Sequence, residues 1–468
     1  MLKAGLIKVQ FRFLHQSSED RRNLILNGPI TPTLLMLTVP TLMMGLVQSA
    51  IPFVDGLFIN NFGGTIAASA INYCIPVVNM SAALAQGLSV ASMAIIGQTN
   101  GRGEFKEARR ISTQIFIFAF LLGFVVAPLL ILAAYPVSNH VTPEISHNVF
   151  IYLALNSIVI PFSFLESIYN GIKNASGKPE AAFVRMLLML VLKVIFNTIF
   201  VGILSWSVVG AVASTFLSNV LISLWMYYEL FVKKSPEKFE LKGFRFDFAV
   251  IRELFRLGIP SAISALILNL GFFLINNEIE KYGPVVMNAQ GIASNITSVC
   301  FNLPSSFSSS VTTMVSMNVG AGQGNKARAS CIRGSIISAI TAAVLVAVIV
   351  PLSSSITVLF TRDTAVLSIA DKALHIYTYS VIGFGVGMVE QGAFVGLGRT
   401  RVTLVMSLLR IWLLRYIFIL VTERMLGFYS VFWGNLFSNY AAALIFTIMI
   451  LRVKWVSVLS HRDMETAA

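Results

Sequence analysis

Long apolar segments without charged residues alternate with short polar loops along most of the chain. Residues 115–135 and 335–352 are two such segments, each at least 18 residues long. A helix of that length crosses the hydrocarbon layer of a bilayer, which is about 30 Å thick. The apolar residues show no alternation of period two, which excludes the strands of an outer-membrane barrel. The pattern predicts about twelve transmembrane helices, near residues 32–60, 66–97, 109–134, 147–172, 180–203, 207–231, 251–280, 285–318, 327–351, 365–395, 402–422 and 427–453.

Polar side chains recur at seven-residue spacing inside these apolar segments. Lipid cannot hydrogen-bond a polar group, so such a group must face protein or water. Seven residues make nearly two turns, so each set forms a stripe on one helix face. The stripes are Gln48 and Asp55; Asn72, Asn79 and Gln86; Asn156, Ser163 and Asn170; Asn269 and Asn276; Asn288, Asn295, Asn302 and Ser309; and Tyr377 and Gln391, whose stripe Phe384 interrupts. We interpret them as the lining of an internal cavity; the alternative is that the amides only hydrogen-bond across helix seams.

The chain contains two copies of one unit. Its only long polar connector, residues 232–250, lies at the midpoint, and the sequences on either side correspond at three places. The corresponding pairs are Pro40 and Pro260, Gly101 and Gly320, and Gly171 and Gly392, at offsets of 220, 219 and 221. Each unit has an even number of helices, so both copies run in the same direction. Such parallel repeats are related by an axis along the membrane normal, and we expect the substrate path between them.

We therefore predict an all-α polytopic membrane protein with two six-helix lobes. The first 27 residues have no apolar region followed by a cleavage site, which favours a retained cytoplasmic tail. The predicted divisions are an N-terminal tail (1–27), an N-lobe (28–231), a cytoplasmic linker (232–250), a C-lobe (251–455) and a C-terminal tail (456–468).

Composition and charge placement support the same class. Hydrophobic residues make up 56% of the chain and charged residues 12%, and the mean hydropathy is +0.79. A net charge of +13 would suit a nucleic-acid partner, but 27 basic residues fall in the tails and alternate loops against 4 in the opposite loops. This asymmetry is the positive-inside rule, which predicts a plasma-membrane protein with both termini cytoplasmic. The excess charge then faces lipid headgroups rather than nucleic acid.

Four charged residues lie at mid-membrane depth or near it. A charge there costs about 2.5–3.5 kcal/mol, so Asp55 needs a partner or a proton. Lys193 and Asn197, one turn apart on a single face of the fifth helix, are candidate partners. Arg410 and Arg415 occupy similar depth in the eleventh helix and are candidate cavity residues.

Other chemistry is not indicated. The three cysteines have no metal-ligand or CxxC spacing, and the five histidines are scattered over loops, tails and helices. A membrane-embedded enzyme would need clustered acids or histidines, so we regard that class as a poor fit. We expect no metal centre and no bound cofactor. Glu278 lies near a predicted helix end, where water is expected to reach it.

The chain resembles the multidrug and toxic compound extrusion (MATE) transporters in several of its motifs. The resemblance rests on the two repeats, on Pro40 followed fifteen residues later by Asp55, on the GxG loops after the second and eighth helices, and on "GRT" after the tenth. It covers about residues 28 to 455. It implies a V-shaped pair of lobes that exports small organic solutes or drugs in exchange for inflowing protons or sodium ions. We expect a monomer, and we interpret Pro40 as a helix bend.

One departure from the family bears on the coupling ion. Family members often have an asparagine and, four residues later, an aspartate in the fifth helix, which form a cation site with the first-helix aspartate. Here those positions hold Lys193 and Asn197. An ammonium group cannot ligate a metal ion and repels it, which disfavours sodium. We hypothesise that Asp55 carries the proton and pairs with Lys193 when it is ionised.

The substrate stays open at this point. Organic cations are the commonest expectation from the resemblance, whereas the basic residues at depth would also suit anions or zwitterions. A lipid-linked precursor flippase of the same superfamily is the main alternative, because Lys193, Arg410 and Arg415 would suit a pyrophosphate headgroup.

Overall fold

The computed structural model describes residues 17–63, 65–139, 141, 143–235, 238–241, 244–358 and 363–456. Most of both predicted tails and part of the linker therefore lie outside the described residues. The same is true of the side chains of Asn72 and Asn276, both predicted to line the cavity.

Each of the twelve predicted segments is helical within the described residues. In five of them, including the first, a stretch of π- or 3₁₀-helix follows or divides the α-helix. In chain order they are α3 (Ile30–Phe58) with η1 (Ile59–Gly63), α4 (Thr65–Arg102), α5 (Phe105–Asn139), α6 (Pro143–Asn156) with η2 (Ser157–Val159) and α7 (Ile160–Ala175), α8 (Pro179–Asn197) with η3 (Thr198–Ile203), α9 (Ser207–Tyr227) with η4 (Tyr228–Val232), α10 (Phe248–Glu280), α11 (Pro284–Gly320), α12 (Gly324–Val358), α13 (Thr364–Gly396), α14 (Thr400–Leu408) with η5 (Leu409–Tyr416) and α15 (Ile417–Leu426), and α16 (Tyr429–Arg452).

Ten of the described segments are long and apolar enough to cross a membrane. The two long helices outside that set, α11 and α13, carry many amides and hydroxyls. They also form the most extensive helix pair in the described part of the molecule. Helices that face protein and a polar cavity tolerate such residues, whereas a lipid-facing helix does not.

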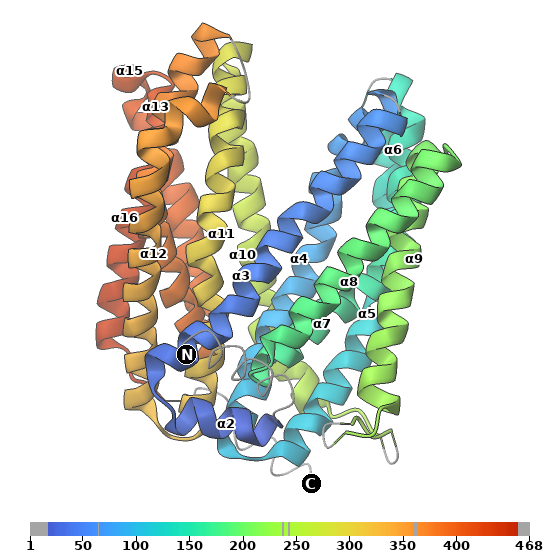
Figure 1. Cartoon of the computed structure of the whole chain (residues 1–468), viewed down its shortest axis with the longest axis vertical. Coiled ribbons are helices and arrows are strands. Elements are labelled where there is room, and N and C mark those ends of the chain that lie inside the picture. The colour runs from blue at the N-terminus through green and yellow to red at the C-terminus, as the bar shows by residue number, and fades with distance from the viewer. Residues whose placement is uncertain are drawn as a thin grey trace, which may run out of the picture.

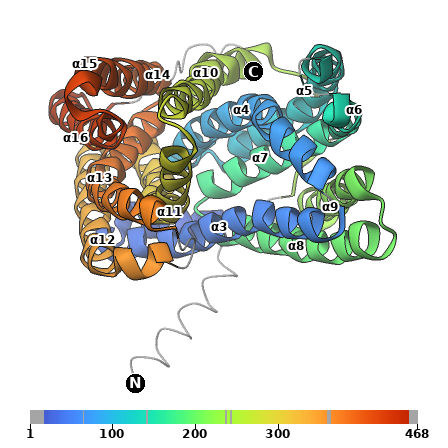
Figure 2. The same cartoon turned by 90° about the horizontal axis from the view of Figure 1, so that it is seen from above.

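The helices form two groups that meet at one end and diverge toward the other, so that the molecule is V-shaped (Figure 1). One group holds α3 to α9 and the other holds α10 to α16, as the view from above shows (Figure 2). The first helix of each group packs against both groups: α3 contacts α8 and α11, and α10 contacts α14 and α4. This matching exchange of contacts confirms the predicted duplication of a six-helix unit. α3 continues as a helix through Pro40, and the bend there stays a prediction.

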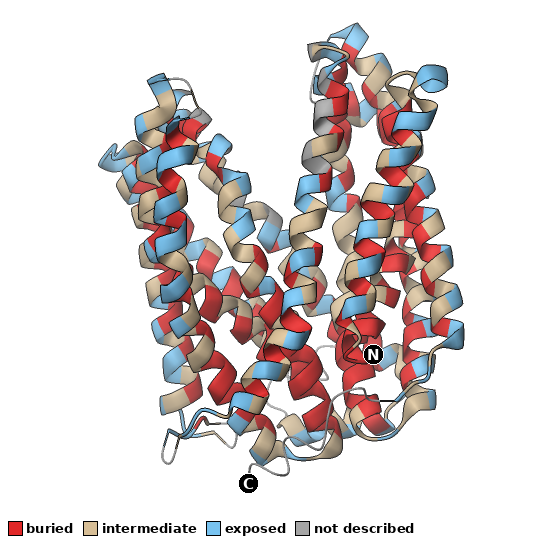
Figure 3. Cartoon of the chain, turned by 180° about the vertical axis from the view of Figure 1, so that it is seen from behind, coloured by how far each residue is buried: buried red, intermediate tan, exposed pale blue. Residues whose placement is uncertain are grey.

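Glycines allow the two lobes to touch at the closed end of the V. A methyl group at Gly101 would lie 2.1 Å from the carbonyl oxygen of Met317, and one at Gly320 would lie 2.1 Å from that of Gln98. Both contacts are related by the repeat offset of 219. No side chain fits at that distance, so the backbones of α4 and α11 are in direct contact. Buried residues concentrate at the same end (Figure 3).

Two further hydrogen bonds join the lobes near these glycines. The buried Gln98 side chain in α4 donates from Nε2 to the carbonyl oxygen of Gly396 in α13, at 2.8 Å. The Thr313 hydroxyl in α11 donates to the carbonyl oxygen of Asn174 in α7, at 3.0 Å. Each bond runs from the second helix of one lobe to the fourth helix of the other.

The end of the predicted N-terminal tail forms a helix, α2 (Ser18–Asn27), which lies across the closed end (Figure 1). A capping box with Ser17 starts it, and hydrogen bonds from Ser17 lower the pKa of Asp20. Arg21 is 1% exposed and pairs with Glu180 of α8 at 2.5 Å. On the other lobe, Lys326 of α12 donates to the carbonyl oxygens of Leu26 and Gly28 at 2.6 and 2.9 Å. The helix thus contacts both lobes.

Candidate functional site

The Asp55 carboxylate lies between α3 and α8. The Lys193 ammonium donates to Oδ2 of Asp55, and Asn197 Nδ2 donates to Oδ1 at 2.8 Å. Lys193 and Asn197 reach the same carboxylate because residues four apart share one face of α8. The structure therefore brings together the three residues predicted for ion coupling; their role in coupling stays a prediction.

Burial of this group is uneven. The Lys193 side chain is 5% exposed and Asn197 is 1% exposed, whereas the Asp55 side chain is 32% exposed. The carboxylate is thus the accessible member and the ammonium is the buried one. Both helices change to π geometry just beyond these residues, at η1 and η3. Such π segments occur frequently at functional sites.

The C-lobe encloses a cavity of about 670 Å³. Five of the residues predicted for a cavity line it, and none of its described lining residues is acidic. They are Asn295, Asn302, Tyr377, Arg410 and Arg415. The volume is within the range of about 300–1,000 Å³ that is typical of small-molecule sites. We name this space the C-lobe cavity.

Both arginines of the C-lobe cavity belong to the π segment η5. Residues five apart in an α-helix point roughly 140° away from each other. The i to i+5 hydrogen bonding of a π-helix instead places them nearly one above the other. Arg410 and Arg415 are accordingly close enough to repel each other, and both are buried, at 7% and 5% exposed. The Arg410 guanidinium stacks over the Phe384 ring at 5.3 Å, and the Arg415 side chain interacts with Tyr377.

A second cavity, of about 440 Å³, lies between the lobes. It is lined by Gln86 of α4, Gln391 of α13 and Arg410, so two further predicted residues, Gln86 and Gln391, fall on one cavity. Because Arg410 lines both spaces, it lies where the inter-lobe cavity meets the C-lobe cavity.

The remaining predicted cavity residues are more dispersed. Asn156 donates to the carbonyl oxygen of Tyr152 and lines a small cavity of about 50 Å³. Gln48, Asn79 and Asn269 are exposed, and Asn269 bonds back to its own helix.

Asn170 accepts a hydrogen bond from Arg185 at 3.1 Å, and Arg185 pairs with Glu166 at 2.8 Å. Asn170 is thus part of a polar network between α7 and α8. That network is the arrangement left open as the alternative to a cavity lining.

Glu278 is 7% exposed, so the expectation that water solvates it is wrong. Its carboxylate is instead held by Lys281 and by the Tyr416 hydroxyl at 3.3 Å. Lys281 follows one turn later at the helix end and folds back over the acid, which is a short-range contact that helix-end position alone does not reveal.

Sequence reasoning missed three amides that line the C-lobe cavity, namely Gln290, Asn435 and Asn439. Gln290 accepts a hydrogen bond from the Tyr377 hydroxyl at 2.6 Å. Asn435 and Asn439 are four apart on one face of α16 and bond to each other at 3.2 Å. A search for amides four apart, besides those seven apart, would have found this pair.

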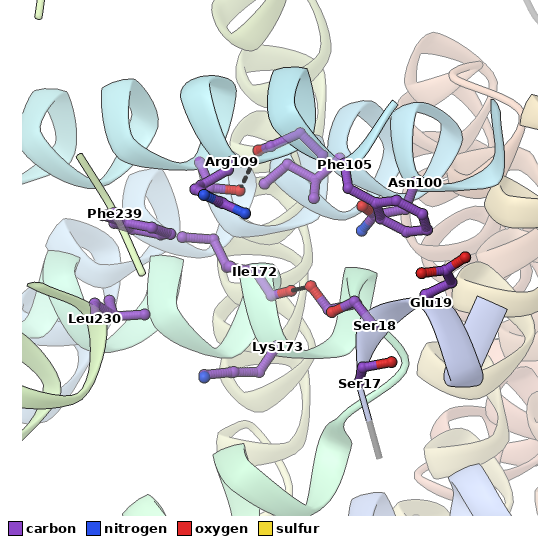
Figure 4. Close-up of a pocket in the computed structure, with 14 residues that line it drawn as sticks. Ser17, Ser18, Glu19, Asn100, Phe105, Arg109, Ile172, Lys173, Leu230 and Phe239 are labelled. Carbon is purple, nitrogen blue, oxygen red and sulfur yellow. Dashed lines mark hydrogen bonds between the residues drawn. The ribbon is translucent and has the colours of Figure 1, made fainter. Parts of the chain in front are cut away.

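Another pocket, of about 280 Å³, lies under α2 at the closed end (Figure 4). Ser17 and Glu19 of the N-terminal segment form one wall, and Asn100, Arg109 and Lys173 belong to α4, α5 and α7. It is separate in its lining residues from the two cavities described above.

Comparison with known proteins agrees with this architecture. A family model described as MatE matches residues 40–199 and 260–421, once in each half, and the two matches begin at the aligned prolines. The chain is 22% identical over 383 residues to the probable multidrug resistance protein YoeA of Bacillus subtilis (strain 168), covering 80% of this chain and 83% of that protein. It is 21% identical over 429 residues to the multidrug export protein MepA of Staphylococcus aureus (strain bovine RF122 / ET3-1), covering 89% and 92%.

A solved structure shares the fold. It is described as the outward-facing conformation of a multidrug resistance MATE family transporter of the MOP superfamily, and it matches with a TM-score of 0.86 at 22% identity, covering 91% of this chain and 96% of that one. The resemblance predicted from the sequence is confirmed. Since the family model matches most of each half, the chain belongs to the MatE family of multidrug and toxic compound extrusion transporters.

Proposed function

We propose that the protein is a secondary active exporter of small organic solutes, driven by proton influx and working by alternating access. The observation that carries the proposal is the partly exposed Asp55 carboxylate held by the buried Lys193. A proton can reach this carboxylate, and its arrival changes the charge balance of the α3–α8 contact. The relatives YoeA, a probable multidrug resistance protein, and MepA, a multidrug export protein, support export as the direction.

Protonation of Asp55 would act on Lys193. Neutral Asp55 no longer compensates the ammonium, which is almost fully buried and then bears the cost of an unpaired charge in an apolar helix pair. Any lobe conformation in which Lys193 reaches water or another partner is then favoured. A proton can drive the exchange of two conformations only if Asp55 binds it more tightly in one of them than in the other.

Protons suit this site better than sodium. Sodium binding needs oxygen ligands around the cation, and here one side of the carboxylate is occupied by an ammonium group that repels a cation. Asn197 donates its amide hydrogen to Asp55, so its nitrogen faces the carboxylate.

We further propose that the V opens to the outside of the plasma membrane. The closed end holds α2 and basic residues of the sequence-defined basic side that the structure describes, among them Arg102, Lys173 and Lys326. The positive-inside rule places that side in the cytoplasm. Both termini are then cytoplasmic, and the chain acts as a monomer surrounded by lipid.

Transport by purified protein in vesicles tests the proposal. An imposed pH gradient should drive uptake of a fluorescent organic dye into wild-type vesicles, and an equal sodium gradient at constant pH should not. Asp55→Asn should reduce the pH-driven rate at least about tenfold, whereas Glu144→Gln, a neutralised acid at the exposed start of α6, should leave it unchanged. Proton drive through Asp55 is rejected if the Asp55→Asn rate equals the wild-type rate.

A flippase for lipid-linked precursors is a second candidate. The basic C-lobe cavity favours it, because Arg410 and Arg415 could receive a phosphate headgroup. Vesicles with a fluorescent anionic lipid in one leaflet separate the two functions, since a flippase moves the lipid and a solute exporter does not.

A further inference from the structure

The C-lobe cavity has a positive charge at its wall. Arg410 lines the cavity at 7% exposed, and no ion pair of the described residues includes it. Its described contact is with the face of Phe384, which attracts a cation but does not neutralise it. Arg415 lies close enough to repel it. A bound anion would relieve this repulsion and supply the missing countercharge.

The described carboxylates near this cavity have other partners. Glu278, on the helix that supplies Ile275 and Ile279 to the lining, is held by Lys281 and Tyr416. Glu390 of α13 accepts a hydrogen bond from Thr447 of α16 at 2.8 Å and does not line the cavity. The countercharge for Arg410 is therefore not supplied by these two acids.

The rest of the lining suits an amphiphilic molecule. Asn295 and Asn302 on one side and Asn439 on the other offer amides that donate or accept hydrogen bonds. Phe301 and Phe384, whose ring centroids are 4.5 Å apart, form an apolar wall beside Arg410. An aromatic body stacks on such rings while an acidic group reaches the guanidinium.

Access is through the inter-lobe cavity. Arg410, Leu268, Ser305 and Met388 line both that cavity and the C-lobe cavity. A ligand entering between the lobes thus meets Arg410 at the boundary of the two spaces.

We propose that the C-lobe cavity binds an organic anion, with its oxyanion head (a carboxylate, phosphate or sulfonate) on Arg410 and its apolar body on Phe301 and Phe384. This inference rests on the proposed export function in one respect: it takes the bound anion to be the transported substrate. Binding itself requires no gradient, so it is tested independently of transport.

Equilibrium binding to the purified transporter in detergent tests the site with two xanthene dyes of opposite charge, fluorescein and rhodamine 123. We expect Arg410→Gln to raise the Kd of fluorescein at least about tenfold, the order expected for one charge-assisted hydrogen bond. Arg410→Lys should restore part of the affinity. The control Arg401→Gln removes a charge at an exposed residue of α14 and should leave the Kd of fluorescein unchanged. The Kd of rhodamine 123 should not rise in Arg410→Gln. An unchanged fluorescein Kd in monodisperse Arg410→Gln overturns the proposal.

Competition in the wild-type protein gives the same test without a variant. Benzoate should displace fluorescein, and benzamide, its neutral isostere, should not; equal displacement by the two overturns the proposal. Nanodiscs of phosphatidylglycerol and of phosphatidylcholine identify the source of the oxyanion. If phosphatidylglycerol competes with fluorescein, a lipid headgroup is the occupant. If the affinity for fluorescein is equal in the two kinds of nanodisc, the occupant is a soluble anion. If fluorescein binds but pH-driven transport fails, the proposed export function is rejected and the anion site in the C-lobe cavity is retained.

Discussion

Of the 34 basic residues, three remain beyond the 27 and 4 that the charge-asymmetry count includes, and each is in or near a π segment. Lys193 lies five residues before η3, and Arg410 and Arg415 lie within η5. Lys193 is compensated by Asp55, whereas Arg410 has no described acid beside it. The two lobes therefore repeat the same helices with different charge: an ion pair in one and a cationic cavity in the other.

The Asp55–Lys193 pair allows a stability prediction. Asp55→Asn leaves the buried ammonium without its countercharge, and breaking a fully buried pair costs about 3–5 kcal/mol. The Asp55 side chain is 32% exposed, so we expect a smaller loss, about 1–3 kcal/mol. The double variant Asp55→Asn/Lys193→Gln should recover most of it, because neither charge then remains.

Thermal unfolding of the purified variants in detergent measures this coupling. The midpoint should fall in Asp55→Asn and return toward the wild-type value in the double variant. Additive effects of the two single substitutions would show that the residues do not interact energetically.

At the scale of the helix, close backbone contact holds the closed end together. Gly101→Ala and Gly320→Ala each add a methyl group 2.1 Å from a carbonyl oxygen of the opposite lobe. Overpacking of this kind costs about 1–3 kcal/mol, and here the strain is relieved by separating α4 from α11. We expect both variants to have lower thermal midpoints and faster hydrogen exchange at the ends of these helices. Gly387→Ala is the control, because its nearest neighbouring atom lies 3.9 Å away; equal effects at all three positions would contradict the role of the contact.

The attachment of α2 to the C-lobe gives a second prediction at this scale. The Lys326 ammonium caps the carbonyl end of α2, where a cation is favoured. In Lys326→Met these hydrogen bonds to a charged donor, worth about 1.5–3 kcal/mol each, are lost and one end of the helix is released.

Hydrogen exchange of the backbone amides of Ser18–Asn27 reports that release. Exchange should accelerate in Lys326→Met, while α8, which holds Arg21 through Glu180, should be unaffected. Arg328→Met, a basic residue two positions along the same helix, serves as the control. Unchanged exchange in α2 would mean that the Lys326 contacts do not hold it.

At the scale of the whole molecule, the closed end and the charge asymmetry together predict an outward-open protein. Asn295→Cys, in the C-lobe cavity, should react with a membrane-impermeant maleimide added to intact cells. Lys106→Cys, exposed at the start of α5 at the closed end, should react only in inside-out vesicles. The three native cysteines are buried and should give little background. The opposite labelling pattern would invert the assigned orientation.

Much of the fold could be predicted because it follows from local rules. An apolar stretch of about 20 residues must become a helix in lipid, since each backbone group then finds a partner within the segment. The repeat was visible because corresponding contacts, such as those of Gly101 and Gly320, need the same small residue in both copies. Contact of Asp55 with Lys193 and Asn197 was predictable because a charge at that depth has few ways to be satisfied.

The sequence by itself therefore determined the helices, the duplication and the residues of the α3–α8 ion pair. Only the tertiary structure decided which end of the V is closed, that α2 bridges the lobes, and that the π geometry of η5 brings Arg410 beside Arg415. These features depend on contacts between segments that are distant in the chain. Helix periodicity carries no information about such contacts, because it specifies the face of a helix and not the partner that the face meets.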